Sequence, residues 1–449
     1  MQGGAADDLV HLKQVGKACG ICNKEPESPS KRQKNELVAP PLDVLRVEDE
    51  LFISQSVDAA LLRARELFAK SVALPIAWLH LDADVESSRA RKHERVKEGA
   101  EIVCRIQQQF RCKLLDRYFL IWSFCAEEEF YLLALPVLFW CGDYRFARHM
   151  TYVVCVGLVW GNLLKDVFRL PRPRNVNSKV WVPANASEID STACRDFGFP
   201  STHAMNAVSN SIFTVMYCVA NGFDVSGGLL GLLAGIWITS LSFGRLYLGV
   251  HSPMDVKAGM LLGLAVAFLA QPLDIFSAFD RFVLHTPYVA LILTIWLSSL
   301  LVLNPQPRPM TPTFMQNCTL GGLILGCSVG FRMEMERRGS VHAFPSEATS
   351  NTLATSVLRV SIGYAILLLA RVALKSLFTS LLRAVGLEPN PAKPVPRSEM
   401  EDCKQEIKGW ELFAAAVLKT SVYASMAWTI VCGAPAVFEM LGIPCEMSG

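Results

Sequence analysis

The sequence feature that most constrains the fold is a series of apolar blocks separated by short polar breaks. Each block is about 20 residues long, the length that spans the hydrocarbon core of a bilayer as a helix. A soluble fold would need helices with one polar face, which the later blocks mostly lack. Because 51% of the residues are hydrophobic and the mean hydropathy is +0.31, we predict an all-α, polytopic transmembrane helical bundle.

About nine spans are predicted from these blocks. Their expected ranges are 117–140, 149–168, 204–221, 226–243, 253–270, 287–303, 314–331, 353–374 and 412–432. The first range contains Glu127, Glu128 and Glu129. Carboxylates are costly in lipid, so these must face protein or water, or the helix begins at a shallower point. Residues 376–410 are predicted to form a polar, proline-bearing loop.

Three regions are expected along the chain. Residues 1–114 form a polar N-terminal region, disordered over 1–40 and with helical periodicity over 44–114 but too little apolar length to span. Residues 115–275 form a core that holds the polar clusters described below, and residues 276–449 add further transmembrane helices. The net charge of +2 provides no field that favours nucleic acid. Many of the 14 cysteines lie in apolar blocks, which indicates small buried residues, not disulfides.

Basic residues give conflicting indications of orientation. Arg145 and Arg148, between the first two spans, favour the cytosolic side, and the arginines after the seventh span fall on the same side by parity. The loops after spans two and four would then be lumenal. However, the basic run at 89–117 would also be lumenal unless the first span is not a true crossing, so the orientation stays open. Glycosylation at the Asn185 sequon would place its loop in the lumen.

Three polar clusters interrupt the apolar pattern. The first, 165–173, ends the second span; the second, 199–203, precedes the third span; and the third, 245–255, lies between the fourth and fifth. By span parity, all three face the same aqueous compartment and can converge.

Such a convergence has the chemistry of a phosphate site. Lys165, Arg172 and Arg245 supply cations for phosphate oxygens. Ser201 precedes a helix start, whose N–H groups attract an anion. Phosphoryl transfer needs little beyond positioning and charge neutralisation. Because no carboxylate-rich metal cage is evident, the three cations are expected to replace a metal, and neither metal nor cofactor is predicted.

Two histidines supply the reactive groups. His251 and Asp255 are spaced i, i+4, so on one helix face the carboxylate can hold the imidazole in a single tautomer, as for an activated nucleophile. His203 can act as a general acid for the leaving alkoxide. A single cation at a span end more often anchors its helix, and a lone histidine is more often structural. The prediction therefore depends on the three clusters together.

At these residues the chain resembles the type 2 phosphatidic acid phosphatase and vanadium haloperoxidase superfamily. The motif "lysine, six residues, Arg-Pro" matches 165–173, Pro-Ser-x-His matches 200–203, and "Ser-Arg, five residues, His, three residues, Asp" matches 244–255 with one departure. Gly244 stands where the family usually has serine, which puts one hydroxyl contact to phosphate in doubt. Ser242 is a candidate to replace it in part.

The resemblance implies a role for each matched residue. His251 would be the nucleophile that forms a phosphohistidine, Asp255 its partner, and His203 the proton donor to the leaving group. The phosphate would be held by Lys165, Arg172, Ser201, Thr202 and Arg245.

Within the superfamily, the chain is most similar to the sphingosine-1-phosphate phosphatases, also called long-chain base phosphate phosphatases. The first motif follows only two spans, several spans continue beyond the third motif, and the local sequences 169–173 and 247–256 resemble that branch. The resemblance implies a multi-pass enzyme of the endoplasmic reticulum membrane. Its substrate would be a lipid phosphate, a sphingoid base 1-phosphate. A homodimer is left open.

Two alternatives stay open at this point. The same chemistry could act on phosphatidic acid, an isoprenoid diphosphate or glucose 6-phosphate, since a nine-span count also resembles glucose-6-phosphatase. A non-catalytic lipid-binding or transport protein with a vestigial site is the alternative of another class. The presence of both His203 and His251 argues against it.

Overall fold

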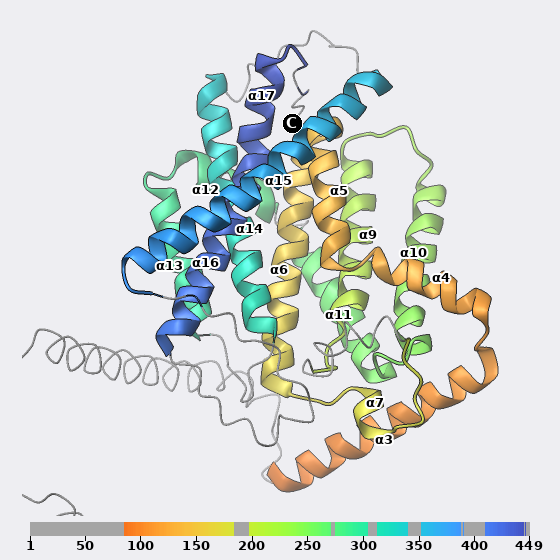
Figure 1. The fold of residues 1–449 in the computed structure, drawn as a ribbon. Helices are drawn as coiled ribbons and strands as arrows, with labels where there is room; N and C mark the ends of the chain where they lie inside the picture. Colours follow the sequence, from red (N-terminus) through yellow and green to blue (C-terminus); the bar gives the residue numbers. More distant parts are fainter. Residues whose placement is uncertain are drawn as a thin grey trace, which may run out of the picture. The chain divides into compact units, whose positions relative to one another are not determined.

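The structure is a computed structural model that describes residues 85–183, 197–270, 274–303, 312–339, 352–387, 389, 409–443 and 445. All of these residues lie in one unit, which spans Ser54–Gly449. Every regular element among them is a helix (Figure 1). The expected disorder over 1–40 and the Asn185 sequon fall outside the described residues.

The described helices agree with the all-α prediction. In chain order they are α3 (Val85–Phe110), α4 (Lys113–Phe124), α5 (Glu128–Cys141), α6 (Tyr144–Phe168), α7 (Pro173–Val176), α9 (Thr202–Ala220), α10 (Gly227–Tyr247), α11 (Pro253–Ala270), α12 (Ile275–His285), α13 (Val289–Leu303), α14 (Pro312–Arg338), α15 (Leu353–Ala384), α16 (Gly409–Trp428), the π-helix η2 (Thr429–Gly433) and α17 (Ala434–Met440). Among them, 4 segments are long and apolar enough to cross a membrane: α10, α14, α15 and Leu412–Met440. The chain is thus a helical protein with several candidate membrane spans.

Close packing of small residues joins the central helices. α9 packs against α6, α10 and α11, and α14 packs against α6 and α16 (Figure 1). A Cβ atom at Gly259 of α11 would lie 2.2 Å from the carbonyl oxygen of Ser201, and one at Gly326 of α14 would lie 1.9 Å from that of Ala424. Only glycine allows these backbones to approach so closely, as at many helix crossings in membranes.

The single helix predicted over 117–140 is wrong. Two helices, α4 and α5, meet at a break over residues 125–127, and in Figure 1 α4 runs across the bundle whereas α5 runs along it. Glu127 lies in this break with an extended backbone (φ −78°, ψ 158°), and its carboxylate faces His203. The break precedes Glu128, the first residue of α5, and it places the Glu127 carboxylate beside His203 and not in lipid, where a carboxylate is costly.

The loop predicted from residue 376 is also wrong at its start. α15 continues to Ala384, past the expected end of the span at 374. The extension contains leucine, lysine, arginine and alanine, which favour helix, and residues 375–388 contain no proline. The polar serines and lysine of this stretch therefore lie on a helix.

A buried ionic cluster lies near the start of α6. Arg148 donates to both carboxylate oxygens of Asp280 on α12, at 3.1 and 2.6 Å, and His149 Nε2 lies 2.7 Å from Oδ2 of the same carboxylate. The Arg148 guanidinium also lies 3.7 Å from the centre of the Phe331 ring. Arg148 is therefore a buried structural residue and gives no indication of membrane orientation.

Candidate active site

The first polar cluster lies where α6 ends. Lys165 is buried in the last turn of α6, and the helix stops at Arg169, whose φ of 52° is left-handed. The chain turns so that Arg172 immediately precedes α7, and its Nη1 donates to the carbonyl oxygen of Val250 at 3.2 Å. This hydrogen bond ties the first cluster to the third, beside His251.

The second cluster is held against the other two. The Ser201 hydroxyl caps α9 by accepting from the Ala204 N–H at 3.4 Å, and the Ser201 N–H donates to the carbonyl oxygen of Asp255 at 3.0 Å. Thr202 packs on α6, since a Cβ at Gly161 would lie 2.6 Å from its Cγ2. The start of α9, where backbone N–H groups favour an anion, therefore adjoins the third cluster.

The third cluster surrounds the turn between α10 and α11. Arg245 is in the last turn of α10, and its carbonyl oxygen accepts from the His251 N–H at 3.3 Å. His251 and Asp255 are each 1% exposed, with His251 Nδ1 3.7 Å from Asp255 Oδ2. The predicted placement of both on one helix face is wrong, because α11 begins only at Pro253. The Asp255 carboxylate instead accepts from the Ser252 N–H at 2.7 Å.

The electrostatic environment keeps both histidines neutral in the substrate-free site. Burial, followed by the positive charges of Arg172, Arg245 and Lys165, holds the pKa of His251 well below its usual value. Burial and Arg245 lower the pKa of His203 to about 4, although Glu127 opposes this shift. A neutral imidazole has the lone pair that a nucleophile needs.

Glu127 is a site residue that the sequence analysis did not identify. Its Oε1 lies 3.2 Å from His203 Nε2 and 4.0 Å from Arg245 Nη1. The side chain is 36% exposed, so the carboxylate is reachable from outside the protein core. The one signal in the sequence is the run of glutamates in an apolar block, which predicts a polar environment for these carboxylates but not the residues that they contact.

Ser123 on α4 is a second residue that the sequence analysis missed. Its hydroxyl accepts a hydrogen bond from Arg245 Nη1. Ser242, the expected partial replacement for the serine of the motif, has a buried hydroxyl with no hydrogen-bond partner among the described residues. No pattern within 113–124 pointed to Ser123, because its role depends on how α4 crosses α10.

Helix α3 braces the site from the N-terminal region. Gln107 Nε2 donates to the carbonyl oxygens of Trp181 and Tyr247, at 2.8 and 2.9 Å, and its Oε1 accepts from the Trp181 N–H at 2.9 Å. Trp181 follows the first cluster and Tyr247 belongs to the third. A residue from the polar N-terminal region therefore fixes the spacing of two motif loops.

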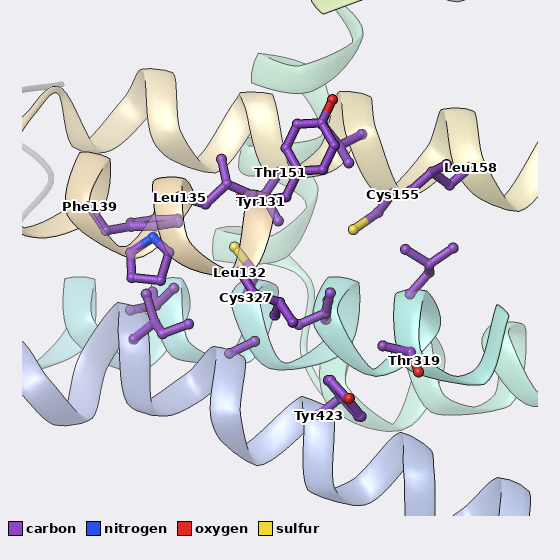
Figure 2. A pocket seen from close by; sticks show the side chains of 17 residues that line it. Tyr131, Leu132, Leu135, Phe139, Thr151, Cys155, Leu158, Thr319, Cys327 and Tyr423 are labelled. Carbon is purple, nitrogen blue, oxygen red and sulfur yellow. The ribbon is translucent and has the colours of Figure 1, made fainter. Parts of the chain in front are cut away.

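An apolar crevice begins one helical turn along α5 from Glu127. It has a volume of about 70 Å³ and is lined by α5, α6, α14 and the segment from α16 into η2 (Figure 2). Tyr131 lines it and follows Glu127 by four residues, which places the two on one face of α5. Leu158 lines it from α6, and Lys165 lies two turns further along the same face. The crevice thus extends away from the cationic groups into the helical bundle.

The described residues include no group of three or more histidine, cysteine, aspartate and glutamate side chains placed to hold a metal ion. Three cations and two imidazoles converge, which suits an anion, and the carboxylates of Asp255 and Glu127 lie beside the two histidines. The arrangement can bind a phosphate with Lys165, Arg172, Arg245 and the start of α9, and can present His251 and His203 to it.

Residues 146–274 match the model of the PAP2 superfamily, the segment that contains all three clusters. A probable sphingosine-1-phosphate phosphatase of Dictyostelium discoideum is 30% identical over 232 residues, which cover 50% of this chain and 54% of that protein. A dihydrosphingosine 1-phosphate phosphatase of Schizosaccharomyces pombe is 29% identical, over 52% of this chain and 56% of that protein. The chain therefore spans about half the length of these two relatives.

Similarity to a third relative extends further along the chain. Lipid phosphate phosphatase delta of Arabidopsis thaliana is 26% identical over 378 residues, which cover 78% of this chain and 88% of that protein. The similarity thus reaches well beyond the segment with the three clusters. No solved structure gives a significant match to the chain.

Proposed function

We propose that this chain, whose residues 146–274 match the PAP2 superfamily model, is a membrane phosphatase that hydrolyses sphingoid base 1-phosphates to the sphingoid base and phosphate. The observation that carries the proposal is the placement of buried His251 among Lys165, Arg172 and Arg245: burial, and then these charges, lower the pKa of its imidazole. Such a neutral, buried imidazole beside three cations suits attack on a bound phosphate monoester.

The first chemical step transfers the phosphoryl group to His251. Nδ1 of His251 faces Asp255, so Nε2 is the nitrogen that attacks phosphorus. The N–P bond forms as the bond from phosphorus to the ester oxygen breaks, and the cations offset charge on the phosphoryl oxygens. A protonated His203 gives its proton to the leaving alkoxide, because the bound phosphate dianion raises the pKa of that imidazole above its value in the empty site.

The second step regenerates the enzyme. Water attacks the phosphohistidine, the N–P bond breaks, and neutral His203 takes the proton that water loses. Asp255 stabilises the positive charge that develops on the His251 ring. The net reaction consumes one water and releases the sphingoid base and phosphate. Ser201 and Thr202, at the start of α9, complete the phosphate-binding set.

The apolar crevice supports a lipid substrate over a sugar phosphate. It begins one turn from Glu127 on α5 and two turns from Lys165 on α6, so a few methylenes of an alkyl chain can lie in it while the phosphate meets the cations. The names of the relatives favour a sphingoid base among lipid phosphates. We place the phosphatase core at 115–275, the additional helices at 276–449, and the N-terminal region at 1–114. The proposal includes about nine spans in the endoplasmic reticulum membrane.

The test is phosphate release by detergent-purified protein in EDTA from sphingosine 1-phosphate, phosphatidic acid and glucose 6-phosphate, measured side by side. We expect release chiefly from sphingosine 1-phosphate, and its loss in His251→Ala. Equal or greater release from glucose 6-phosphate would contradict the lipid assignment. Absence of release from all three, with a folded protein, would favour a non-catalytic lipid-binding role.

A further inference from the structure

Glu127 places a carboxylate in a site built for an anion. It is the N-cap residue of α5, yet its side chain makes no capping hydrogen bond. The carboxylate instead lies 3.2 Å from His203 Nε2 and 4.0 Å from Arg245 Nη1. Arg245 is one of the three cations expected to hold the phosphate, so Glu127 borders the phosphate position.

This placement creates an electrostatic conflict for a simple phosphate ester. A phosphate dianion on Arg245 would lie close to a second negative charge, and like charges at such a distance repel strongly where water is partly excluded. Arg245 and His203 offset part of this repulsion, and a further positive group between the two anions reduces it more. A substrate that carries its own cation next to the phosphate would supply that group.

The order of groups along the protein matches the order of groups along such a substrate. Arg245, which is expected to hold the phosphate, lies 4.0 Å from Glu127. Tyr131, four residues further along α5, lines the apolar crevice. In a sphingoid base 1-phosphate, the ammonium-bearing carbon follows the carbon of the phosphate ester, and the alkyl chain continues beyond it. The phosphate can therefore contact the cations while the ammonium contacts the Glu127 carboxylate and the alkyl chain enters the crevice.

We propose that Glu127 binds the ammonium group of the substrate and so selects amine-bearing lipid phosphates over those that lack a cation. This inference rests on the proposed function and specifies its substrate class. The carboxylate accepts hydrogen bonds from the ammonium, a charge-assisted contact that strengthens in a partly dry site. For a lipid phosphate without the ammonium, only His203 and Arg245 offset the repulsion between phosphate and Glu127, and such a lipid binds less well.

The competing role for Glu127 is to position the His203 imidazole. A positioning carboxylate would serve every substrate equally, because protonation of the leaving oxygen does not depend on a distant amine. An ammonium-binding carboxylate affects only substrates that carry the amine. The two roles therefore differ in how a Glu127 variant changes the ratio of two substrates.

The experiment compares kcat/KM for sphingosine 1-phosphate and its N-acylated counterpart, ceramide 1-phosphate, in the same detergent micelles. Acylation removes the positive charge and leaves the phosphate ester intact. For the wild-type protein we expect at least a tenfold preference for the free amine. Glu127→Gln should lower kcat/KM for the amine substrate about tenfold or more, and leave that for the acylated substrate unchanged or higher. Glu129→Gln, at an exposed neighbour, is the matched control and should leave the preference intact.

Several results would overturn the inference. An equal loss on both substrates in Glu127→Gln would assign Glu127 to positioning His203, and no loss on either would leave it without a role. N-methylated sphingosine 1-phosphate tests whether a substituent on the nitrogen, and not the loss of charge, lowers kcat/KM. It keeps the positive charge and should remain a good substrate. If Glu127→Gln does not fold, the wild-type comparison decides, since equal kcat/KM for amine and acylated lipids contradicts ammonium binding. Equal hydrolysis of both lipids would refute this inference alone, whereas hydrolysis of neither would refute the proposed function as well.

Discussion

A Cβ atom at Gly244 would lie 2.9 Å from Cδ1 of Phe119. Helix α4 therefore packs directly on the bare backbone of α10, one residue before Arg245. One turn further along α4, Ser123 accepts a hydrogen bond from the Arg245 guanidinium. The glycine that departs from the superfamily motif thus makes room for a helix that supplies its own hydroxyl to the same arginine.

Gly244→Ser should damage the protein even though it restores the usual motif. The new side chain would push against Phe119, and overpacking of this kind costs about 1–3 kcal/mol. We expect a lower thermal unfolding midpoint in detergent and lower kcat/KM. In a Phe119→Ala background, Gly244→Ser should change the unfolding midpoint and kcat/KM only slightly, because the ring that it would push against is absent. A gain in activity from Gly244→Ser alone would show that α4 does not constrain this position.

Ser123→Ala should weaken catalysis through Arg245. Loss of an acceptor for a charged donor costs about 1.5 kcal/mol or more, so kcat/KM should fall roughly tenfold. Ser242→Ala is the matched control, because that buried hydroxyl has no hydrogen-bond partner among the described residues. Steady-state kinetics on both variants decide the point. If Ser123→Ala and Ser242→Ala changed kcat/KM to the same extent, the result would contradict a role for Ser123 in the site.

How far the sequence predicted this site depends on where each residue lies. Lys165 and His251 could be identified because their spacing to neighbouring motif residues is fixed over short stretches of chain, and span parity places those stretches on one side. Glu127, Ser123 and Gln107 could not, because their roles depend on how α3, α4 and α5 pack against distant segments. The break before α5 and the extension of α15 could not be predicted either, because both depend on how these helices pack against the rest of the protein. Block length alone does not locate where a helix bends or ends.

The free energy of unfolding should decrease as the pH falls, because His203 is neutral in the folded protein. Its folded pKa is about 4, below the value near 6.5 of an unfolded histidine. Between these values the unfolded chain binds more protons, so stability is full above pH 6.5 and is lost as the pH falls toward 4. The loss from this group is roughly 3 kcal/mol at pH 4.

Thermal unfolding in detergent from pH 7 to pH 4 measures this effect. The protein with His203 should lose more stability over that range than His203→Gln, which removes the titrating group. Carboxylates remote from His203 titrate alike in both proteins and cancel in the comparison. Glu127, whose carboxylate contacts His203, is replaced by glutamine in both proteins. Equal slopes for the two proteins would contradict the depressed pKa of His203.

Asp280→Asn should destabilise the fold without changing the chemistry. It leaves Arg148 buried without its carboxylate partner, and breaking a buried ion pair costs about 3–5 kcal/mol. Arg148 and Lys165 are about 25 Å apart along α6, so KM of the folded fraction should stay unchanged. Asp274→Asn is the control, since Asp274 pairs with Arg281 in a largely exposed contact. Equal unfolding midpoints for the two variants would contradict a structural role for the cluster.

The most direct test of the account is to find where the phosphoryl group resides during turnover. Protein mixed with 32P-labelled sphingosine 1-phosphate would be quenched in alkali within a single turnover, because phosphohistidine survives alkali and is labile in acid, and the labelled peptide would then be mapped. The account predicts label on His251, and neither label nor turnover in His251→Ala. Label on another residue, or wild-type turnover by His251→Ala, would contradict it.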